Sequence, residues 1–509
     1  MDIWEWVEEA TEALRESGGE RLADLIDELS SACCDGEHER VENMVPEALS
    51  LARAAKHPWL EVFIRHWLLQ SRVLHRHDVS RDTMKQAVSL IEFASRPETR
   101  SCPQSVCAVQ DLASAYGLVD GVGFAAERLA VTEEALGRID PSWPCFDCVS
   151  SERVNALLDL ERHAEALELC ERQLAQHPRS TTGLQGNRFR ALSALGRHRE
   201  ALVVAEKIDM ANSGESGAVT HALYRALAHA RLGEVAQALD LLPAFSRLEP
   251  EHYQDFLRCV RELGPGDGHP NTWRIERAIA SMVRTLERYE SYFTLAHLHK
   301  QAAELAVQRG ARRSAEQHLF AARSTAAHLR EPTWLLEKLS PIEAALAKLD
   351  APPRYESVEA TLEALGSDPE ADLAILEASA SPLDARLEDI AVRALSALGA
   401  TVEARARLES ACGRFPDDLG LFEQLLTMLR VAGEHDELRA LCESRTDAGY
   451  VEARWAWAQS AEEQGDHEGA RSRCQEVLAR DPEHAGARLL LARLQREAND
   501  LDAALATLE

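Results

Sequence analysis

The sequence predicts an all-α protein built from tandem helical repeats, and three observations support this prediction. Alanine, leucine, glutamate and arginine dominate the 509 residues, while aromatic residues make up only 5%. This composition favours helices over sheets. A short turn followed by an alanine-rich segment recurs along the chain, and no alternating strand pattern is evident. The length exceeds one ordinary globular core, which agrees with several domains or one extended array.

The net charge and the N-terminal segment argue against several classes of protein. The 56 basic and 85 acidic residues give a formal net charge of −29, which argues against binding nucleic acid or an anionic membrane. Residues 1–10 show no secretory signal, and no stretch reaches the roughly 18 apolar residues of a membrane span. Eleven scattered cysteines indicate reduced thiols. We therefore expect a cytoplasmic protein, and 50 arginines against six lysines suggest a bacterial source.

The repeated unit has a fixed internal spacing. Nine turn positions share one phase, and they are Gly121, Glu161, Gly196, Gly233, Gly310, Gly399, Gly433, Gly465 and Asn499. The fifth residue after the turn is alanine in eight units, at Ala126, Ala166, Ala201, Ala238, Ala315, Ala404, Ala470 and Ala504, with Leu438 as the exception. Seventeen residues after the turn, four units have a proline, at Pro178, Pro250, Pro416 and Pro482. The period is about 34 residues.

Each unit is expected to be a pair of amphipathic helices. Glycine and asparagine tolerate the left-handed conformation that ends a helix. Proline ends the second helix because it cannot donate the backbone hydrogen bond. A single hairpin cannot cover its own apolar face, so the units must stack on one another.

Changes in the repeat pattern along the chain predict three structural regions. Residues 1–100 form an N-terminal helical region of irregular repeats, with helical runs at 4–29, 38–56, 58–77 and 80–95. Residues 101–350 form a repeat array with a long loop near 264–271, a stretch with two prolines and three glycines. The proline-containing stretch 350–355 separates this array from a C-terminal array at 351–509.

The units resemble the tetratricopeptide repeat family. The resemblance rests on the period, the glycine turn, the small residue after it, the terminal proline and small residues in the first helix such as Ala226, Ala458 and Ala492. It is strongest over 151–250 and 386–509, and it implies a right-handed α-solenoid whose first helices line a concave groove for a peptide or helix. We therefore expect a non-catalytic scaffold or adaptor that binds another protein. The alternative is a regulatory or sensor subunit that controls an effector enzyme.

Candidate partner-binding residues follow from the same resemblance. A subset of the family clamps a C-terminal carboxylate, and Asn155 and Asn187 match its two asparagine positions, whereas Ser151, Thr220 and Tyr224 stand where basic residues are expected. Nearby arginines are candidates for bidentate pairing with acidic side chains of a partner, and they are Arg188, Arg190, Arg225 and Arg231. Solvated arginines on an acidic solenoid are the alternative reading.

Two cysteine pairs are the sharpest local signal. Cys102 and Cys107 form one pair, and Cys145 and Cys148 form the other. Cys107 and Cys148 are expected at the starts of first helices in consecutive units, so four thiolates would converge on a structural zinc ion at about 2.3 Å each. The alternative is four reduced thiols that never meet, and no other cofactor is expected.

Signatures of catalysis are missing from the sequence. It contains no phosphate-binding loop of the type Gly-x-x-x-x-Gly-Lys-Ser/Thr, no Gly-x-Gly-x-x-Gly after a strand, no His-Glu-x-x-His and no Gly-x-Ser-x-Gly. Cysteine and histidine are both plentiful, so an unrecognised Cys–His site is the enzymatic alternative. We expect no enzymatic activity.

Overall fold

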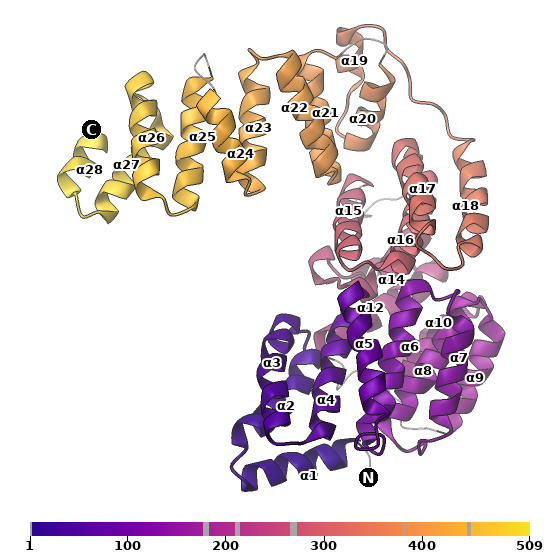
Figure 1. The fold of residues 1–509 in the computed structure, drawn as a ribbon. Coiled ribbons are helices and arrows are strands. Elements are labelled where there is room, and N and C mark those ends of the chain that lie inside the picture. Colours follow the sequence, from indigo (N-terminus) through magenta and orange to yellow (C-terminus); the bar gives the residue numbers. More distant parts are fainter. Residues whose placement is uncertain are drawn as a thin grey trace. The chain divides into compact units, whose positions relative to one another are not determined.

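The computed structural model describes residues 3–176, 183–208, 214–264, 272–379, 383–444 and 449–508. Within these ranges the chain forms α-helices with a few short 3₁₀ or π segments and no β-strand, which confirms the all-α prediction. The chain divides into two compact units, Met1–Ala351 and Pro352–Glu509, called unit 1 and unit 2 below (Figure 1). No helix in the described ranges has the length and apolar character needed to cross a membrane.

Helical hairpins follow one another through both units. The helices of unit 1 are α1 (Ile3–Glu16), α2 (Glu20–Cys34), α3 (His38–Ala54), α4 (Pro58–Leu69), α5 (Arg81–Ala94), α6 (Cys107–Asp120), α7 (Ala125–Leu136), α8 (Pro144–Asp159), α9 (His163–Gln176), α10 (Gly183–Ala194), α11 (His198–Lys207), α12 (Gly214–Arg231), α13 (Val235–Leu241), α14 (Tyr253–Leu263), α15 (Thr272–Arg288), α16 (Tyr292–Gln308), α17 (Arg312–Ala326) and α18 (Thr333–Leu346). A π-helix, η1 (Gln70–His75), and three 3₁₀ segments, η2 (Pro103–Val106), η3 (Phe245–Arg247) and η4 (Pro250–His252), complete unit 1.

Unit 2 repeats the same pattern. Its helices are α19 (Val358–Ala364), α20 (Pro369–Ala378), α21 (Ala385–Leu398), α22 (Thr401–Arg414), α23 (Leu419–Val431), α24 (His435–Ser444), α25 (Tyr450–Glu463), α26 (His467–Arg480), α27 (Ala485–Glu497) and α28 (Leu501–Leu508). From α20 onward each helix packs against the next in the chain, and α21, α23 and α25 also pack in succession.

Left-handed residues end the first helices, as the repeat pattern predicts. Eight of the nine predicted turn residues have a positive φ: Glu161, Gly196, Gly233, Gly310, Gly399, Gly433, Gly465 and Asn499. At Gly196 the next amide, that of Arg197, donates back to the carbonyl of Leu192 at 2.9 Å, which satisfies a carbonyl at the helix end. In these eight units the residue five positions after the turn is buried, and six alanines at this position have no exposed surface: Ala166, Ala201, Ala238, Ala315, Ala404 and Ala470.

The prediction is wrong for the Gly121 unit. Gly121 has a helical φ of −58° at the end of α6, and Ala126 is exposed whereas Ala125 is buried. Glycine is needed there for a different reason, because a Cβ at position 121 would lie 2.6 Å from Oδ2 of Asp159 and 2.7 Å from Cε1 of Phe293. The residue therefore marks a close approach of other helices and not a left-handed turn.

Two further details of the prediction need correction. The predicted helical run at 4–29 is two helices, because Gly18 adopts a left-handed φ of 82° between α1 and α2. Pro250 does not end a second helix, since α13 stops at Leu241 and Pro250 opens η4. Pro178 and the predicted loop over 265–271 lie outside the described residues, and Gly264 ends α14 just before that loop.

Continuous apolar cores run between the stacked hairpins. One core in unit 1 extends from Ile3 to Phe146, so it continues across position 100 without a break. A second core continues from Val154 to Leu305. In unit 2 a core joins α25, α26 and α27 between Ala458 and Leu494. Each hairpin thus covers the apolar face of its neighbour, as stacked repeats require.

Candidate functional site

Unit 1 contains a partly open cavity of about 670 Å³. Its wall comes mainly from the first helices of successive hairpins, namely α6, α8, α10, α12, α14, α16 and α18, with η1 added. Many of these helices also pack on one another in order, as α6 on α8, α8 on α10, α12 on α14, α14 on α16 and α16 on α18. Their faces therefore form one inner wall, and its volume lies within the roughly 300–1,000 Å³ that is usual for ligand pockets.

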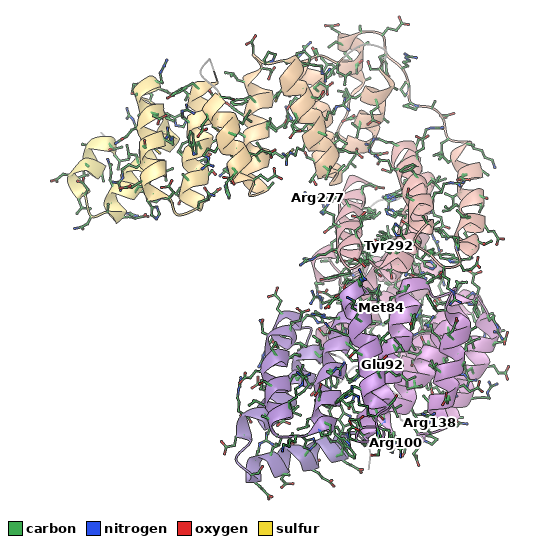
Figure 2. All side chains as sticks on the ribbon, in the orientation of Figure 1. Met84, Glu92, Arg100, Arg138, Arg277 and Tyr292 are labelled. Atoms are coloured by element: carbon green, nitrogen blue, oxygen red, sulfur yellow. The ribbon has the colours of Figure 1, made fainter. Side chains whose placement is uncertain are left out.

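Segments that are far apart in the sequence meet around the cavity. Helix α6 packs against α16, whose N-terminal residue Tyr292 is marked in Figure 2. The amide of Val79, shortly after η1, donates to the carbonyl of Tyr289 at 3.0 Å. The amide of Glu331, just before α18, donates to a carboxylate oxygen of Asp120 at 2.8 Å. In unit 1 the inner face of the hairpins thus forms a cavity that is walled on several sides and partly open to solvent.

The structure separates the six predicted partner-binding residues into two groups. Asn155 on α8 and Arg190 on α10 line the cavity. Nη1 of Arg190 donates to Oδ1 of Asn155 at 3.1 Å, so the two form one pair across consecutive repeats. The other four do not line the cavity, and they are Asn187, Arg188, Arg225 and Arg231.

Two of these four residues connect neighbouring hairpins. Asn187 is buried, and its Nδ2 donates to the carbonyl of Ser151 at 3.0 Å. Nη1 of Arg231 donates to the carbonyl of Ser193 at 3.0 Å. The side chains of Asn187 and Arg231 therefore form bonds within the protein, between one first helix and the next.

The sequence analysis did not identify the cavity residues that α14, α16 and α18 contribute. They are Arg258 on α14, His297 on α16, and Trp334 and Lys338 on α18. The imidazole of His297 stacks on the indole of Trp334, with ring centroids 4.6 Å apart and an interplanar angle of 23°. These residues lie between 250 and 350, where the spacing of the repeats is least regular, so the phase of the first helices gave no sharp signal for them.

Most cations of the wall are paired with carboxylates. The ion pairs are Arg128–Asp159 at 2.6 Å, Arg258–Asp255 at 2.8 Å and Lys338–Glu161. Arg190 differs, because its hydrogen bond goes to an amide oxygen and the described residues place no carboxylate within ion-pairing distance of it. A guanidinium carries five N–H donors, so Arg190 retains donors for a further acceptor.

Burial sets the charge of the groups on the wall. Burial lowers the pKa of His297 to about 3, and the charges of Arg258 and Lys338 add to the lowering. Burial also lowers the pKa of Arg258 in spite of its pairing with Asp255. For Arg190, burial lowers the pKa, but Tyr224 and Asp255 outweigh this and hold it above its usual value. At neutral pH both arginines are charged, and His297 is neutral.

The four cysteines of the predicted zinc site do not all meet. Sγ of Cys107 lies 3.6 Å from Sγ of Cys145, and both residues are buried. Cys102 is buried, whereas Cys148 is exposed. Within the described residues, no three histidine, cysteine, aspartate or glutamate side chains are placed to hold a metal ion together. A structural zinc ion takes four ligands, so the arrangement provides a close pair of thiols and not a four-ligand set.

Other cysteines lack the environment of a nucleophile. Burial raises the pKa of Cys170 and Cys442 to about 12 and that of Cys474 to about 11. Cys170 donates to the carbonyl of Leu184 at 2.9 Å. A catalytic cysteine needs a thiolate, which forms where the pKa is lowered, so these thiols are suited to packing.

Comparison with known proteins identifies the repeats at one end of the chain. Residues 461–509 match the family model described as "Tetratricopeptide repeat". No curated protein matches the sequence. A solved structure entitled "Crystal structure of APC/C hetero-tetramer Cut9-Hcn1" aligns with 96% of this chain and 92% of that chain, at 12% identity and a TM-score of 0.28. The assignment to a family therefore rests on the matched repeats and on the hairpins described above.

Proposed function

We propose that the protein is a non-catalytic scaffold of the tetratricopeptide repeat type, since residues 461–509 match that family model and similar hairpins recur along the chain. We propose further that it binds a segment of another protein inside the cavity of unit 1. The observation that supports this proposal most strongly is the cavity itself, which is walled by the first helices of the hairpins. Repeat proteins of this kind bind partners on the inner surface of the stack.

The volume of the cavity limits what it holds. A helix with its side chains is about 10 Å across and rises about 5.4 Å per turn, so one turn fills roughly 400 Å³. A cavity of about 670 Å³ therefore has room for a few residues of an extended segment or for a turn of helix. The sequence had led us to expect a peptide or a helix, and a stretch of either fits the cavity. A cytoplasmic location and a bacterial source remain predictions from the sequence.

A variant that fills the cavity tests this proposal. Thr220 on α12 lines the cavity, so Thr220→Trp would place an indole inside it. Val235 on α13 is 39% exposed and does not line it, which makes Val235→Trp the matched control. Full-length wild type and both variants would be used for affinity capture from the native host, with mass spectrometry of the proteins retained. We expect Thr220→Trp to lose a partner that wild type and Val235→Trp retain, and equal retention by all three would contradict the proposal.

A further inference from the structure

We propose that the cavity of unit 1 recognises an acidic side chain within the bound segment, through the guanidinium of Arg190. This inference rests on the proposed function and specifies the chemistry of its ligand. It goes beyond the scaffold role because it predicts an aspartate or glutamate at a fixed place in the segment, next to apolar residues.

The first step of the argument is the incomplete pairing of Arg190. Its side chain is partly buried on the wall, and Nη1 donates to Oδ1 of Asn155. Partly desolvated arginines usually have a carboxylate partner, because an unpaired charge is costly away from water. Among the described residues of the wall, no carboxylate lies within ion-pairing distance of Arg190. A carboxylate of a ligand would supply the missing partner through a bidentate contact.

The second step concerns the carboxylates that lie somewhat farther from Arg190. Glu152, Asp159 and Asp255 contribute to its raised pKa. Asp159 and Glu152 both contact Arg128, and Asp255 is paired with Arg258. Each of these carboxylates thus has a cation other than Arg190 as its ion-pair partner.

The third step concerns the other cations of the wall. Arg128, Arg258 and Lys338 each have a carboxylate partner within the protein. Among the described Arg and Lys side chains of the wall, Arg190 is therefore the one whose pairing an incoming carboxylate would complete.

The fourth step separates a side chain from a chain terminus. The two asparagines that would hold a C-terminal carboxylate are engaged within the protein. Asn155 accepts from Arg190 and donates to Glu152 at 3.2 Å. Asn187 is 5% exposed, donates to Ser151 and does not line the cavity. The guanidinium of Arg190 is thus the available group, and it does not require a free terminus.

Apolar residues of the wall complete the description of the ligand. Leu158, Leu223, Phe293 and Trp334 line the cavity together with the charged groups. Pockets of this mixed kind use a few polar groups for orientation and apolar area for affinity. We therefore expect apolar or aromatic residues beside the acidic one.

The test uses a random heptapeptide library displayed on phage, in which the C-terminus of each peptide is joined to the coat protein. Selection would be carried out on full-length wild type, Arg190→Met, Arg190→Lys and the control Arg188→Met. Arg188 lies on the same helix, contacts Glu171 at 3.5 Å and does not line the cavity. A selected peptide would then be synthesised with glutamate or glutamine at the acidic position, and with a free or amidated C-terminus. Circular dichroism would confirm that each variant is folded.

We expect peptides selected on wild type and Arg188→Met to share an acidic residue. Exchange of glutamate for glutamine should weaken their binding at least tenfold, as expected for a charged hydrogen-bonded pair. The preference should fall below twofold in Arg190→Met and be partly restored in Arg190→Lys. A preference that survives in Arg190→Met, or binding that requires a free C-terminus, would overturn the inference.

The experiment also separates this inference from the proposed function. Peptides that bind wild type but not Thr220→Trp, and that share no acidic residue, would overturn the inference and leave the scaffold proposal intact. Selection of no peptide, or of peptides that bind Thr220→Trp equally well, would contradict both.

Discussion

The guanidinium of Arg190 and the amide of Asn155 are joined by a 3.1 Å hydrogen bond between residues that are 35 positions apart. This separation is one repeat, so the bond connects corresponding faces of α8 and α10 on the wall of the cavity. Asn155 also donates to Glu152. The pair therefore belongs to the packing of the hairpins, and it also holds the guanidinium of Arg190 at the cavity.

Removal of a buried cation should destabilise unit 1 strongly. Arg128 is 3% exposed, and it contacts Asp159 at 2.6 Å and Glu152 at 3.5 Å. Arg128→Met would leave these carboxylates without their cation, at an expected cost of about 3–5 kcal/mol. Arg138, which is labelled in Figure 2, forms an exposed ion pair with Glu134 and provides the control. Urea unfolding should show a loss below about 1 kcal/mol for Arg138→Met, and equal losses for both variants would contradict the role assigned to Arg128.

Replacement of glycine by alanine should destabilise unit 2 at a turn but not within a helix. Gly433 has a φ of 75° and open space around it, so Gly433→Ala should destabilise unit 2 by about 1 kcal/mol through backbone strain alone. Gly413 lies within α22 and also has open space around it. Gly413→Ala should therefore stabilise unit 2 by about 0.5 kcal/mol. Thermal unfolding of both variants measures this difference, and shifts of the same sign would contradict the assignment of the turns.

Unit 1 should lose stability on acidification because it buries neutral histidines. Burial lowers the pKa of His299 to about 3, and His318, which lies 3.2 Å away, adds to this. An unfolded histidine binds its proton near pH 6.5, so the contribution is lost as the pH falls below that value. Between pH 7 and pH 5 the loss from His299 is about 2 kcal/mol.

The variant His299→Gln isolates this effect. Its free energy of unfolding should fall by about 2 kcal/mol less than that of wild type between pH 7 and pH 5. Exposed His467 in unit 2 offers the control His467→Gln, which should behave as wild type. If the free energy of unfolding depends on pH in the same way for wild type and His299→Gln, the conclusion that His299 is buried as a neutral imidazole is wrong.

The cysteines should behave as thiols and not as zinc ligands. The structure brings Cys107 and Cys145 together but provides no third ligand in the described residues, and a structural zinc ion needs four. Purified protein should therefore contain less than half an equivalent of zinc by elemental analysis. One equivalent of zinc, together with a lower melting temperature of Cys145→Ser after metal removal, would restore the four-cysteine hypothesis.

The repeat pattern predicted the hairpins because each element depends on local chemistry. Gly196, Gly233 and Gly465 end helices in the left-handed conformation that glycine tolerates. In the units whose turn residue is left-handed, the alanines five positions after the turn are buried. Gly121 was misassigned because its role is a contact with Asp159 and Phe293, and a contact between distant helices leaves no local signal.

The candidate site was predicted only in part. Asn155 and Arg190 were found because they lie in the two repeats with the clearest phase, and both line the cavity. Asn187 shares the expected register, but it is buried between hairpins and bonded to Ser151. The contribution of His297 depends on the packing of α16 against α6 beside the cavity. That packing is a tertiary property, and no spacing within a repeat indicates it.

Site-specific photocrosslinking tests the central claim most directly. Benzoylphenylalanine would replace Thr220, which lines the cavity, or Phe320, which is 74% exposed on α17 and does not line it. Both proteins would be irradiated in cells of the native host, and the crosslinked peptides would be identified by mass spectrometry. We predict that position 220 is crosslinked to a short segment of one partner protein and that position 320 is not. Failure of position 220 to crosslink, or the same products from both positions, would contradict the account.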